Sequence, residues 1–479
     1  MKPFPIRRSL GLLVCTVLLS ATAFGQTGAD FFAQGLKAYN SKDYAKSAEL
    51  YRKAYTAEPK SQLTALYNVA CCFALMGKKD DAFATLDELA KAGYNEPSFA
   101  ESDTDFATIR TDARWKPIIA ALTENAKKHP PAKRWTAPYK ILDLPANTAG
   151  LVEHLGTSDS AVWLDGDMLS FIHRSKAANV RLSGGIQEAM QKLPGTDVWL
   201  IQLTMPGGWD KAFDTYNFVE DGNYKPSGTV WRGRRSPKAP EAAAPLQGRV
   251  EKRTIHSDAL NEDRRIFIYL PPNAPAADIP AVFMADGDAC EDFAKVLEPL
   301  ILAHKVQPCA IVGMAAGTYK GDMKNGYDMS KDFRALEYLP GIDPDRYNAH
   351  MKFFCDEVGA YVAKEFGIST SRDKHAVTGF SNGGAFAAGA AFARPDFFCA
   401  AMPLSLGIPP TNPVKTANTP AIYFAAGTLE SFGMRTGDFY EKVKALGVRT
   451  SYDTYTAGHD SAMWQMAFSR LIPKVFPAQ

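Results

Sequence analysis

The pentapeptide Gly379-Phe380-Ser381-Asn382-Gly383 constrains the fold more than any other feature of this 479-residue chain. It follows HAVTG, an apolar segment typical of a buried strand, and it opens GGAFAAGAAFA, whose small residues favour a helix packed closely on a sheet. A serine flanked by glycines in a sharp strand-to-helix turn is the pattern of a nucleophile elbow. The alternative is an ordinary turn serine, because a bare G-x-S-x-G match is weak by itself.

The surrounding segment, residues 250–479, alternates strand patterns with helix patterns. Helices are predicted at 346–366, 383–393 and 437–446. Several strand segments are nearly continuous apolar runs, which indicates strands covered on both faces, and such alternation predicts a parallel α/β sheet. The predicted strands are IFIYLPP, PAVFMADGD, CAIVGMAAG, HAVTGFS, CAAMPLSLG, AIYFAAG and TSYDTYTAG.

A nucleophilic serine needs a base and an acid, which follow it along the chain in α/β enzymes of this kind. Among eight histidines only His459 lies beyond Ser381, directly after the last predicted strand. Glu430 follows the strand AIYFAAG and is the predicted acid, because it can orient the imidazole and stabilise its charged form. Asp438 is the rival, but it falls inside the next helix. Asp460 is poorly placed to reach Nδ1 of the adjacent histidine.

Two backbone N–H groups are needed to stabilise an oxyanion. We expect one from Asn382, the residue after the nucleophile, and the other from Gly287 or Asp288, in the loop after the strand PAVFMAD. The alternative for this loop is a simple polar turn, Asp286-Gly287-Asp288.

The segment resembles the esterase family of α/β-hydrolases that includes enterochelin esterases, esterase D and feruloyl esterases. The matching stretches, spread over about 200 residues, are MADGD, RALEYLPG, AVTGFSNGGAFAAGAAFARPDFF, FAAGTLESF and TAGHDSAMW. The resemblance implies that Ser381, Glu430 and His459 attack a carboxylic ester, with no cofactor and no metal.

The family resemblance also covers an R-x-x-E-Y element formed by Arg334, Glu337 and Tyr338. In related esterases this element lies near the substrate cleft, which implies a substrate-binding role for the three residues. The alternative is an ion pair between Arg334 and Glu337 on the surface of a helix.

Residues 26–131 are predicted to be helical and contain two stretches that repeat with an offset of 35 residues. Small residues at the first two repeated positions would let paired helices approach closely, and larger apolar residues at the others would fill the space between turns. The aligned pairs are Gly35 with Ala70, Ser47 with Ala82, Tyr51 with Leu86 and Ala54 with Leu89. This pattern resembles tetratricopeptide repeats, which usually bind a partner segment in a concave groove. The alternative is a helical spacer.

Residues 132–232 carry short strand patterns, AVWL, MLSFIH, VRLSG, DVWLIQL and YNFVEDG, which predict a small β-sandwich. Their order resembles the immunoglobulin-like domain that precedes the hydrolase in enterochelin esterases. Related carbohydrate modules carry Asn-x-Trp after the glycines, whereas this chain has Ile186-Gln187-Glu188, which favours a structural or lid role. The Ala/Pro-rich stretch 233–249 is predicted to be a linker.

The first residues have the layout of a secretory signal peptide. Lys2, Arg7 and Arg8 precede an apolar run, 10–19, and small residues follow in ATAFG. The run is shorter than the roughly 20 residues that a spanning helix needs. We therefore expect residues 1–25 to be removed, leaving a periplasmic or secreted protein without a stable membrane span.

Charge and cysteine content exclude other classes of protein. Lys plus Arg number 54 and Asp plus Glu 52, a balance that does not indicate a nucleic-acid binder. No Cys or His spacing resembles a zinc site, and the adjacent Cys71 and Cys72 lie in a helical pattern as small apolar residues.

Together these features predict an exported serine esterase acting on a siderophore, feruloyl or other acyl ester through an acyl-enzyme. One alternative is an acyltransferase of the same fold, in which a sugar or lipid hydroxyl replaces water. The other is a tetratricopeptide-type binding protein whose hydrolase domain is a non-catalytic scaffold.

Overall fold

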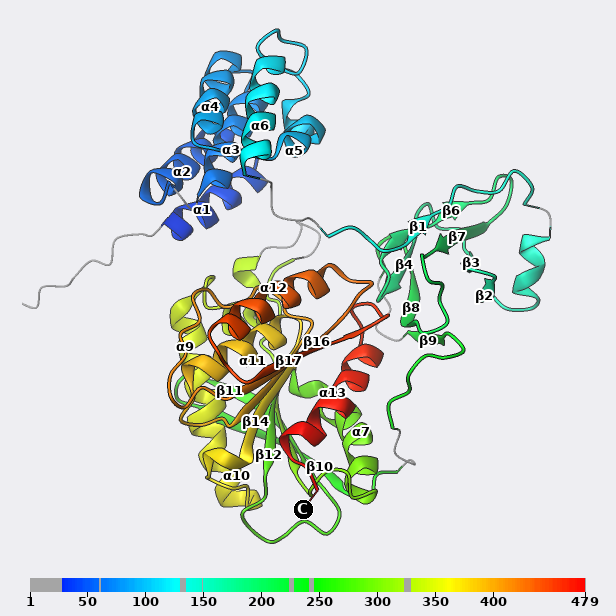
Figure 1. Ribbon diagram of the computed structural model, residues 1–479, viewed down its shortest axis with the longest axis vertical. Coiled ribbons are helices and arrows are strands. Elements are labelled where there is room, and N and C mark those ends of the chain that lie inside the picture. Colours follow the sequence, from blue (N-terminus) through cyan, green and yellow to red (C-terminus); the bar gives the residue numbers. More distant parts are fainter. Residues whose placement is uncertain are drawn as a thin grey trace, which may run out of the picture. The chain divides into compact units, whose positions relative to one another are not determined.

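The computed structural model describes residues 28–59, 62–129, 135–148, 150–223, 228–240, 245–322 and 329–478. The predicted signal peptide, 1–25, lies outside these residues. The chain divides into two compact units, 1–134 and 135–479 (Figure 1). Within the described residues, no helix has the length and apolar character needed to span a membrane.

The first unit is built from helices that repeat in pairs. The starts of the third and fourth helices follow those of the first and second by 35 residues, the offset found in the sequence. The helices are α1 (Gly28–Asn40), α2 (Tyr44–Ala57), α3 (Leu63–Leu75), α4 (Lys79–Lys91), α5 (Pro97–Ser102), a 3-10 turn (Thr104–Phe106) and α6 (Trp115–Lys128).

Close helix packing explains the small residues at the repeated positions. A β-carbon on Gly35 would lie 2.9 Å from the ring of Tyr51, and the hydroxyl of Ser47 donates to the carbonyl of Gly35 at 2.9 Å. Ala70 and Ala82, the matching residues of the second pair, are fully buried. The predicted helical region and its period are therefore confirmed.

The second unit begins with two antiparallel sheets. The first has the order β1 (Lys140–Ile141), β7 (Val198–Thr204), β3 (Met168–Arg174) and β2 (Ser160–Asp165), with β6 (Gln191–Lys192) also on β7; the second has the order β5 (Glu188–Ala189), β4 (Val180–Gly184), β8 (Phe213–Glu220) and β9 (Thr229–Arg232). A 3-10 helix (Leu151–Leu155) precedes β2. Phe171 and Ile201 of one sheet share a core with Leu182 and Phe218 of the other, so the sheets pack face to face. The short strands β1, β5, β6 and β9 were not predicted, because two to four residues are too few to display a period.

An eight-stranded sheet follows, in the order β10 (Arg249–Ser257), β11 (Glu262–Leu270), β13 (Ala310–Met314), β12 (Ala281–Ala285), β14 (His375–Phe380), β15 (Ala400–Leu404), β16 (Ala421–Gly427) and β17 (Thr450–Tyr455). Strands β13 to β17 in this order pair in parallel, as predicted, whereas β10 and β11 add an antiparallel edge. Strand β10 was missed because its sequence, RVEKRTIHS, is that of a polar edge strand; it begins at the end of the predicted linker.

Helices cover both faces of this sheet (Figure 1). On β12, Phe283 packs into the core on one face, whereas Val282 and Met284 pack into the core on the other, the period of two expected for a strand. One face carries α7 (Cys290–Leu302) and α13 (Ser461–Val475); the other carries α8 (Phe333–Tyr338), α9 (Pro344–Lys352), a π-helical segment (Phe353–Glu357), α10 (Val358–Phe366), α11 (Asn382–Ala393) and α12 (Ser431–Ala445). Short 3-10 turns lie at Gly287–Ala289, Met329–Lys331 and Arg372–Lys374.

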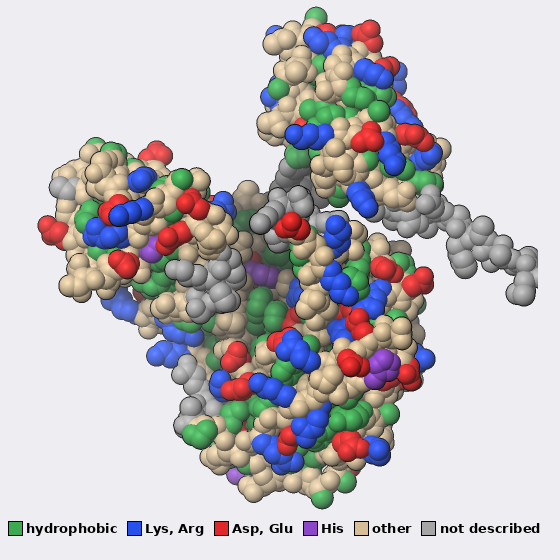
Figure 2. All heavy atoms as spheres, turned by 180° about the vertical axis from the view of Figure 1, so that it is seen from behind, with side chains coloured by type: hydrophobic (Ala, Val, Ile, Leu, Met, Phe, Trp, Pro, Cys, Tyr) green, Lys and Arg blue, Asp and Glu red, His purple; other side chains and the backbone are tan. Residues whose placement is uncertain are grey.

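The strand order has a topological switch point beside β12. The chain leaves β12 to form β13 on one side of it, and later returns to form β14 on the other side. At such a switch point the loops after the two neighbouring strands diverge, and ligands of open α/β sheets bind there. On the face seen in Figure 2, basic and acidic side chains are intermingled over this domain.

Candidate active site

Ser381 occupies a strained turn between β14 and α11. Its φ of 58° and ψ of −124° are unusual for a residue with a side chain. A β-carbon on Gly379 would lie 2.4 Å from the carbonyl oxygen of Gly383, and one on Gly384 would lie 2.5 Å from that of Leu404. The glycines around the serine are therefore required by close backbone approach, which is the arrangement a nucleophile elbow needs.

Asn382 begins α11, so its N–H is one of the first-turn groups that have no acceptor within the helix. The residue after it, Gly383, is crowded by the loop that follows β12: a β-carbon there would lie 2.5 Å from Oδ2 of Asp286. The structure thus brings the turn after β14 into contact with the loop after β12, the two places from which oxyanion donors were predicted.

Gly287 and Asp288 lie in this second loop. A β-carbon on Gly287 would lie 2.3 Å from the carbonyl carbon of Gly313, so only glycine fits. The carboxylate of Asp288 is half-exposed and lies 3.1 Å from the guanidinium of Arg265. The side chain of Asp288 is thus paired outside the turn. The predicted oxyanion donors in this loop remain the backbone N–H groups of Gly287 and Asp288, as the sequence analysis proposed.

Arg334 of α8 ties the two loops together. Its Nε and Nη2 donate to the two oxygens of Asp286 at 2.6 and 2.8 Å, and Nη2 also donates to the carbonyl of Phe380 at 3.2 Å. Arg334 therefore pairs with Asp286. The alternative of an ion pair between Arg334 and Glu337 on a helix surface does not hold. Asp286 was seen in the sequence only as part of a polar turn, because its partner lies 48 residues away.

Glu337 and Tyr338 face the protein interior, which corrects the expectation that they bind substrate directly. The Glu337 side chain has no exposed area and accepts hydrogen bonds from Arg264 at 2.7 Å and Arg346 at 2.6 Å. Burial would raise the pKa of Glu337, yet the nearby cationic groups lower it to about 2. Tyr338 is buried and accepts a hydrogen bond from the N–H of Asp286 at 2.9 Å. Tyr338 therefore supports the loop after β12, whereas Glu337 accepts from the N–H of Gly317, after β13, at 3.1 Å.

His459 and Glu430 meet at the ends of β17 and β16. Nδ1 of His459 is hydrogen-bonded to Oε2 of Glu430, which is buried. The other oxygen of Glu430 accepts from the hydroxyl of Ser405 at 2.6 Å and the N–H of Gly427 at 2.7 Å. Asp438 is exposed within α12. The structure therefore brings the histidine to Glu430 and not to its rival.

Aromatic side chains that the sequence analysis missed hold the imidazole. The ring of His459 stacks on Phe432 at 4.0 Å and meets the ring of Trp464 edge-on at 5.0 Å. Trp464 stacks in turn on Phe380 at 4.1 Å, and its Nε1 donates to the hydroxyl of Ser405 at 3.0 Å. The available signal was an aromatic residue shortly after the predicted acid and another after the predicted histidine, in TLESF and HDSAMW.

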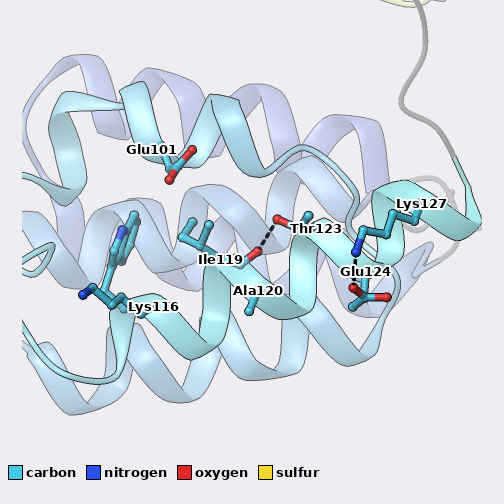
Figure 3. Close-up of a pocket in the computed structure, with 8 residues that line it drawn as sticks. Glu101, Lys116, Ile119, Ala120, Thr123, Glu124 and Lys127 are labelled. Carbon is cyan, nitrogen blue, oxygen red and sulfur yellow. Dashed lines mark hydrogen bonds and ion pairs between the residues drawn. The ribbon is translucent and has the colours of Figure 1, made fainter.

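Two other features lie in the helical unit and lack such chemistry. A hollow of about 430 Å³ between α5 and α6 is lined by Glu101, Trp115, Lys116, Ile119, Ala120, Thr123, Glu124 and Lys127 (Figure 3). Two of its charged side chains, Lys127 and Glu124, pair with each other. Elsewhere Cys71, Asp103 and Asp105 cluster, but tyrosine hydroxyls already donate to both carboxylates at 2.6 Å.

Part of the α/β domain matches the model of a known protein family. Residues 257–421 match the model of the family described as "Putative esterase". The matched part includes Ser381, Arg334 and the loop after β12, whereas Glu430 and His459 follow it along the chain. The α/β domain is therefore an esterase-family domain.

Solved structures share the fold of the second unit. The enterobactin esterase FES from Shigella flexneri is 16% identical, with a TM-score of 0.52, and the match covers 69% of this chain and 99% of that one. The ferric enterobactin esterase from Salmonella typhimurium is 14% identical, with a TM-score of 0.51, covering 66% and 96%. The two matches cover 69% and 66% of this chain, which is more than the α/β domain alone occupies. The similarity in fold therefore extends to the two sheets that precede this domain.

A curated relative matches a smaller part of the chain. This relative, a chloroplastic protein from Arabidopsis thaliana, is 26% identical over 94 residues, which is 19% of this chain and 28% of that protein. The chain thus spans less than a third of the length of this relative.

Proposed function

We propose that the protein is a serine ester hydrolase in which Ser381 is the nucleophile, His459 the base and Glu430 the acid. One observation carries the proposal. A strained serine at the end of β14 and a histidine bonded to a buried carboxylate at the ends of β17 and β16 stand on the same edge of one parallel sheet. An esterase-family match over the serine supports the same reaction.

In the proposed reaction, Oγ of Ser381 attacks the ester carbonyl while His459 takes its proton. The N–H of Asn382 and an N–H from Gly287 or Asp288 stabilise the oxyanion. The alcohol leaves with the proton from the imidazolium, and water then attacks the acyl-enzyme with the same histidine as base. Glu430 keeps the imidazole in the required tautomer and stabilises its charged form.

We propose that the substrate is a siderophore ester or another acyl ester, which the enzyme hydrolyses outside the cytoplasm. Support for the first comes from the fold shared with two enterobactin esterases, and support for export comes from the signal-like segment 1–25. Assays with enterobactin, feruloylated xylan fragments and short acyl esters would rank these candidates. We also propose that the helical repeats bind a segment of a partner protein.

The test is the change Ser381→Ala with p-nitrophenyl acetate as substrate. We expect kcat to fall by roughly three orders of magnitude or more, because the nucleophile is lost, with an unchanged Tm. The control is Ser371→Ala, an exposed serine at the start of a surface turn, which should keep full activity. Activity in Ser381→Ala above a few per cent would overturn the proposal; adding a sugar acceptor to the wild-type assay reveals any acyl transfer.

A further inference from the structure

The loop that carries His459 lies against the β-sandwich. The N–H of Phe213, at the start of β8, donates to the carbonyl of Thr456 at 3.0 Å, and Phe213 also pairs with Ala457 as an isolated parallel bridge. A β-carbon on Gly458 would lie 2.2 Å from the backbone of Gly185, at the end of β4. Residues immediately before the histidine are therefore positioned by the preceding domain.

A pair of buried carboxyl groups completes this contact. Asp214 of β8 is 1% exposed, and Asp460, directly after the histidine, is 5% exposed. A β-carbon on Gly185 would lie 1.7 Å from Oδ1 of Asp214 and 2.6 Å from Oδ2 of Asp460. The two oxygens thus face each other across the space that the glycine leaves. Two ionised carboxylates so placed would repel strongly in a dry interior, whereas one shared proton turns the contact into a hydrogen bond.

The other hydrogen bonds of the pair indicate which group holds the proton. Asp460 caps α13, where the helix dipole favours a negative charge, and accepts from the N–H of Met463 at 2.9 Å and of Thr215 at 3.2 Å. Asp214 accepts only from the N–H of Ile186, at 3.2 Å, through Oδ2. Its Oδ1 receives no hydrogen bond from the described N–H and O–H groups. Oδ1 of Asp214 can therefore carry a proton and donate a hydrogen bond to Oδ2 of Asp460.

We propose that Asp214 is a positioning residue for the reaction: a neutral carboxylic acid that donates a hydrogen bond to Asp460 and so fixes the His459 loop on the sandwich. The proposal rests on the function proposed above. Burial and the charge of Asp460 raise the pKa of Asp214, which keeps the acid protonated where an exposed one would be ionised. When pH rises far enough to remove this proton, two buried charges repel and the histidine is displaced.

Other ionisable groups surround the pair. Those on the elements packed against it are Tyr139 and Glu188 near β5, Asp210 and Lys211 before β8, Arg232 on β9, His459 itself, and Arg470 and Lys474 farther along α13. Tyr139 donates to Glu188 at 2.9 Å, and its burial raises its pKa. The guanidinium of Arg232 lies over the ring of Phe213, 5.2 Å from its centre. All these groups remain in the variants below, so their titration is common to every profile.

The experiment compares three variants of the full chain with wild type: Asp214→Asn, Asp214→Ala and the control Asp197→Asn, a sandwich carboxylate in an exposed pair with Arg174. The readouts are kcat and KM for p-nitrophenyl acetate between about pH 5 and 10. Asp214→Asn keeps kcat within about threefold near neutral pH, because its amide can donate in place of the acid. It should also lose the fall in kcat that wild type and Asp197→Asn share on the alkaline side.

Asp214→Ala removes the donor at every pH and should lower kcat about tenfold or more with KM nearly unchanged, since a displaced catalytic group costs rate rather than binding. If Asp214→Asn repeats the alkaline profile of wild type, or Asp214→Ala keeps the kcat of wild type, the proposal is wrong.

Thermal unfolding separates this proposal from the proposed function. A carboxyl group whose pKa is raised by folding binds more protons in the folded state, so its contribution to stability is lost as pH rises from the ordinary carboxyl range through the raised pKa. The Tm of Asp214→Asn minus that of wild type should therefore grow with pH. A constant difference overturns the shared proton. If wild type hydrolyses no ester, the proposed function fails, while this measurement still decides the pair.

Discussion

The two regions that precede the α/β domain differ in where they bury their apolar side chains. The helical unit closes a core of its own, in which Leu66, Phe106 and Trp115 pack together. The core of the sandwich instead takes in Leu429, which comes from the loop beside the predicted acid of the α/β domain. The helical unit is thus a separate compact unit, whereas the sandwich and the α/β domain belong to one compact unit and share part of a core.

Hydrogen bonds repeat this distinction. The sandwich reaches the loop of His459 through the N–H groups of Phe213 and Thr215, which donate to Thr456 and Asp460 on either side of the histidine. A region that merely precedes an active site in the sequence can therefore be part of its support. Consequently, we expect changes in the sandwich to alter catalysis and comparable changes in the helical unit to alter only that unit.

The largest effect should come from Glu430, the proposed catalytic acid, and this effect sets the scale for the comparison. Glu430→Gln should lower kcat by up to about 10⁴-fold, because an amide cannot stabilise the imidazolium and favours the wrong tautomer. Asp438→Asn, on the exposed side of α12, should leave kcat nearly unchanged. The measurement is kcat for one soluble ester; a crippled Asp438→Asn with a nearly normal Glu430→Gln would refute the assignment.

A smaller loss is expected where the α/β domain supports the loop after β12, which carries the proposed oxyanion donors Gly287 and Asp288. Arg334→Gln removes the two-pronged contact with Asp286 and should lower kcat by roughly 100-fold, since displaced oxyanion donors act mainly on the transition state. KM should change little. The control is Arg265→Gln, which breaks an exposed pair with Asp288 of the same loop. Equal losses in the two variants would mean that Arg334 has no special role.

Substitution of one crowded glycine in each of the two regions that precede the α/β domain compares these regions directly. Gly185→Ala forces a β-carbon against both carboxyl groups of the sandwich contact and should lower kcat about tenfold. Gly35→Ala forces one against the ring of Tyr51 in the helical unit and should lower the stability of that unit alone. Steady-state kinetics and thermal unfolding of both variants test this, and a loss of kcat in Gly35→Ala would break the distinction.

The smallest effect should follow removal of the helical unit. A chain beginning at Trp135, the first residue of the second unit, should fold and hydrolyse small esters with kcat within about twofold of the full chain. Solubility, circular dichroism and activity on p-nitrophenyl acetate are the measurements. An insoluble or inactive product would show that the repeats complete the catalytic body.

Much of the fold was predictable because its signals are local. The 35-residue offset, the apolar strands of the large sheet and the small residues after Ser381 each reflect burial within one element. The strands missed were short, or polar like β10 at the edge of the sheet. The candidate residues Ser381, Glu430 and His459 were also visible, because each follows a predicted strand.

The partners of the charged side chains could not be predicted. The carboxylate of Asp286 accepts hydrogen bonds from Arg334, and the two residues are 48 positions apart in the sequence. The N–H of Thr215 donates to Asp460, and these residues are 245 positions apart. Such pairs depend on strand order and on how two domains pack, neither of which leaves a period in the sequence. For the same reason Glu337 was predicted to bind substrate, although packing turns it into the interior.

The sequence by itself therefore determined the elements, their order and the residue types at the strand ends, since side-chain burial and turn chemistry act over a few neighbouring residues. Only the tertiary structure decided that Arg334 joins the loop after β12 to the end of β14, and that Asp214 faces Asp460 beside His459. Those contacts form because the sheet brings distant strand ends together, and burial then requires each polar group to find a partner.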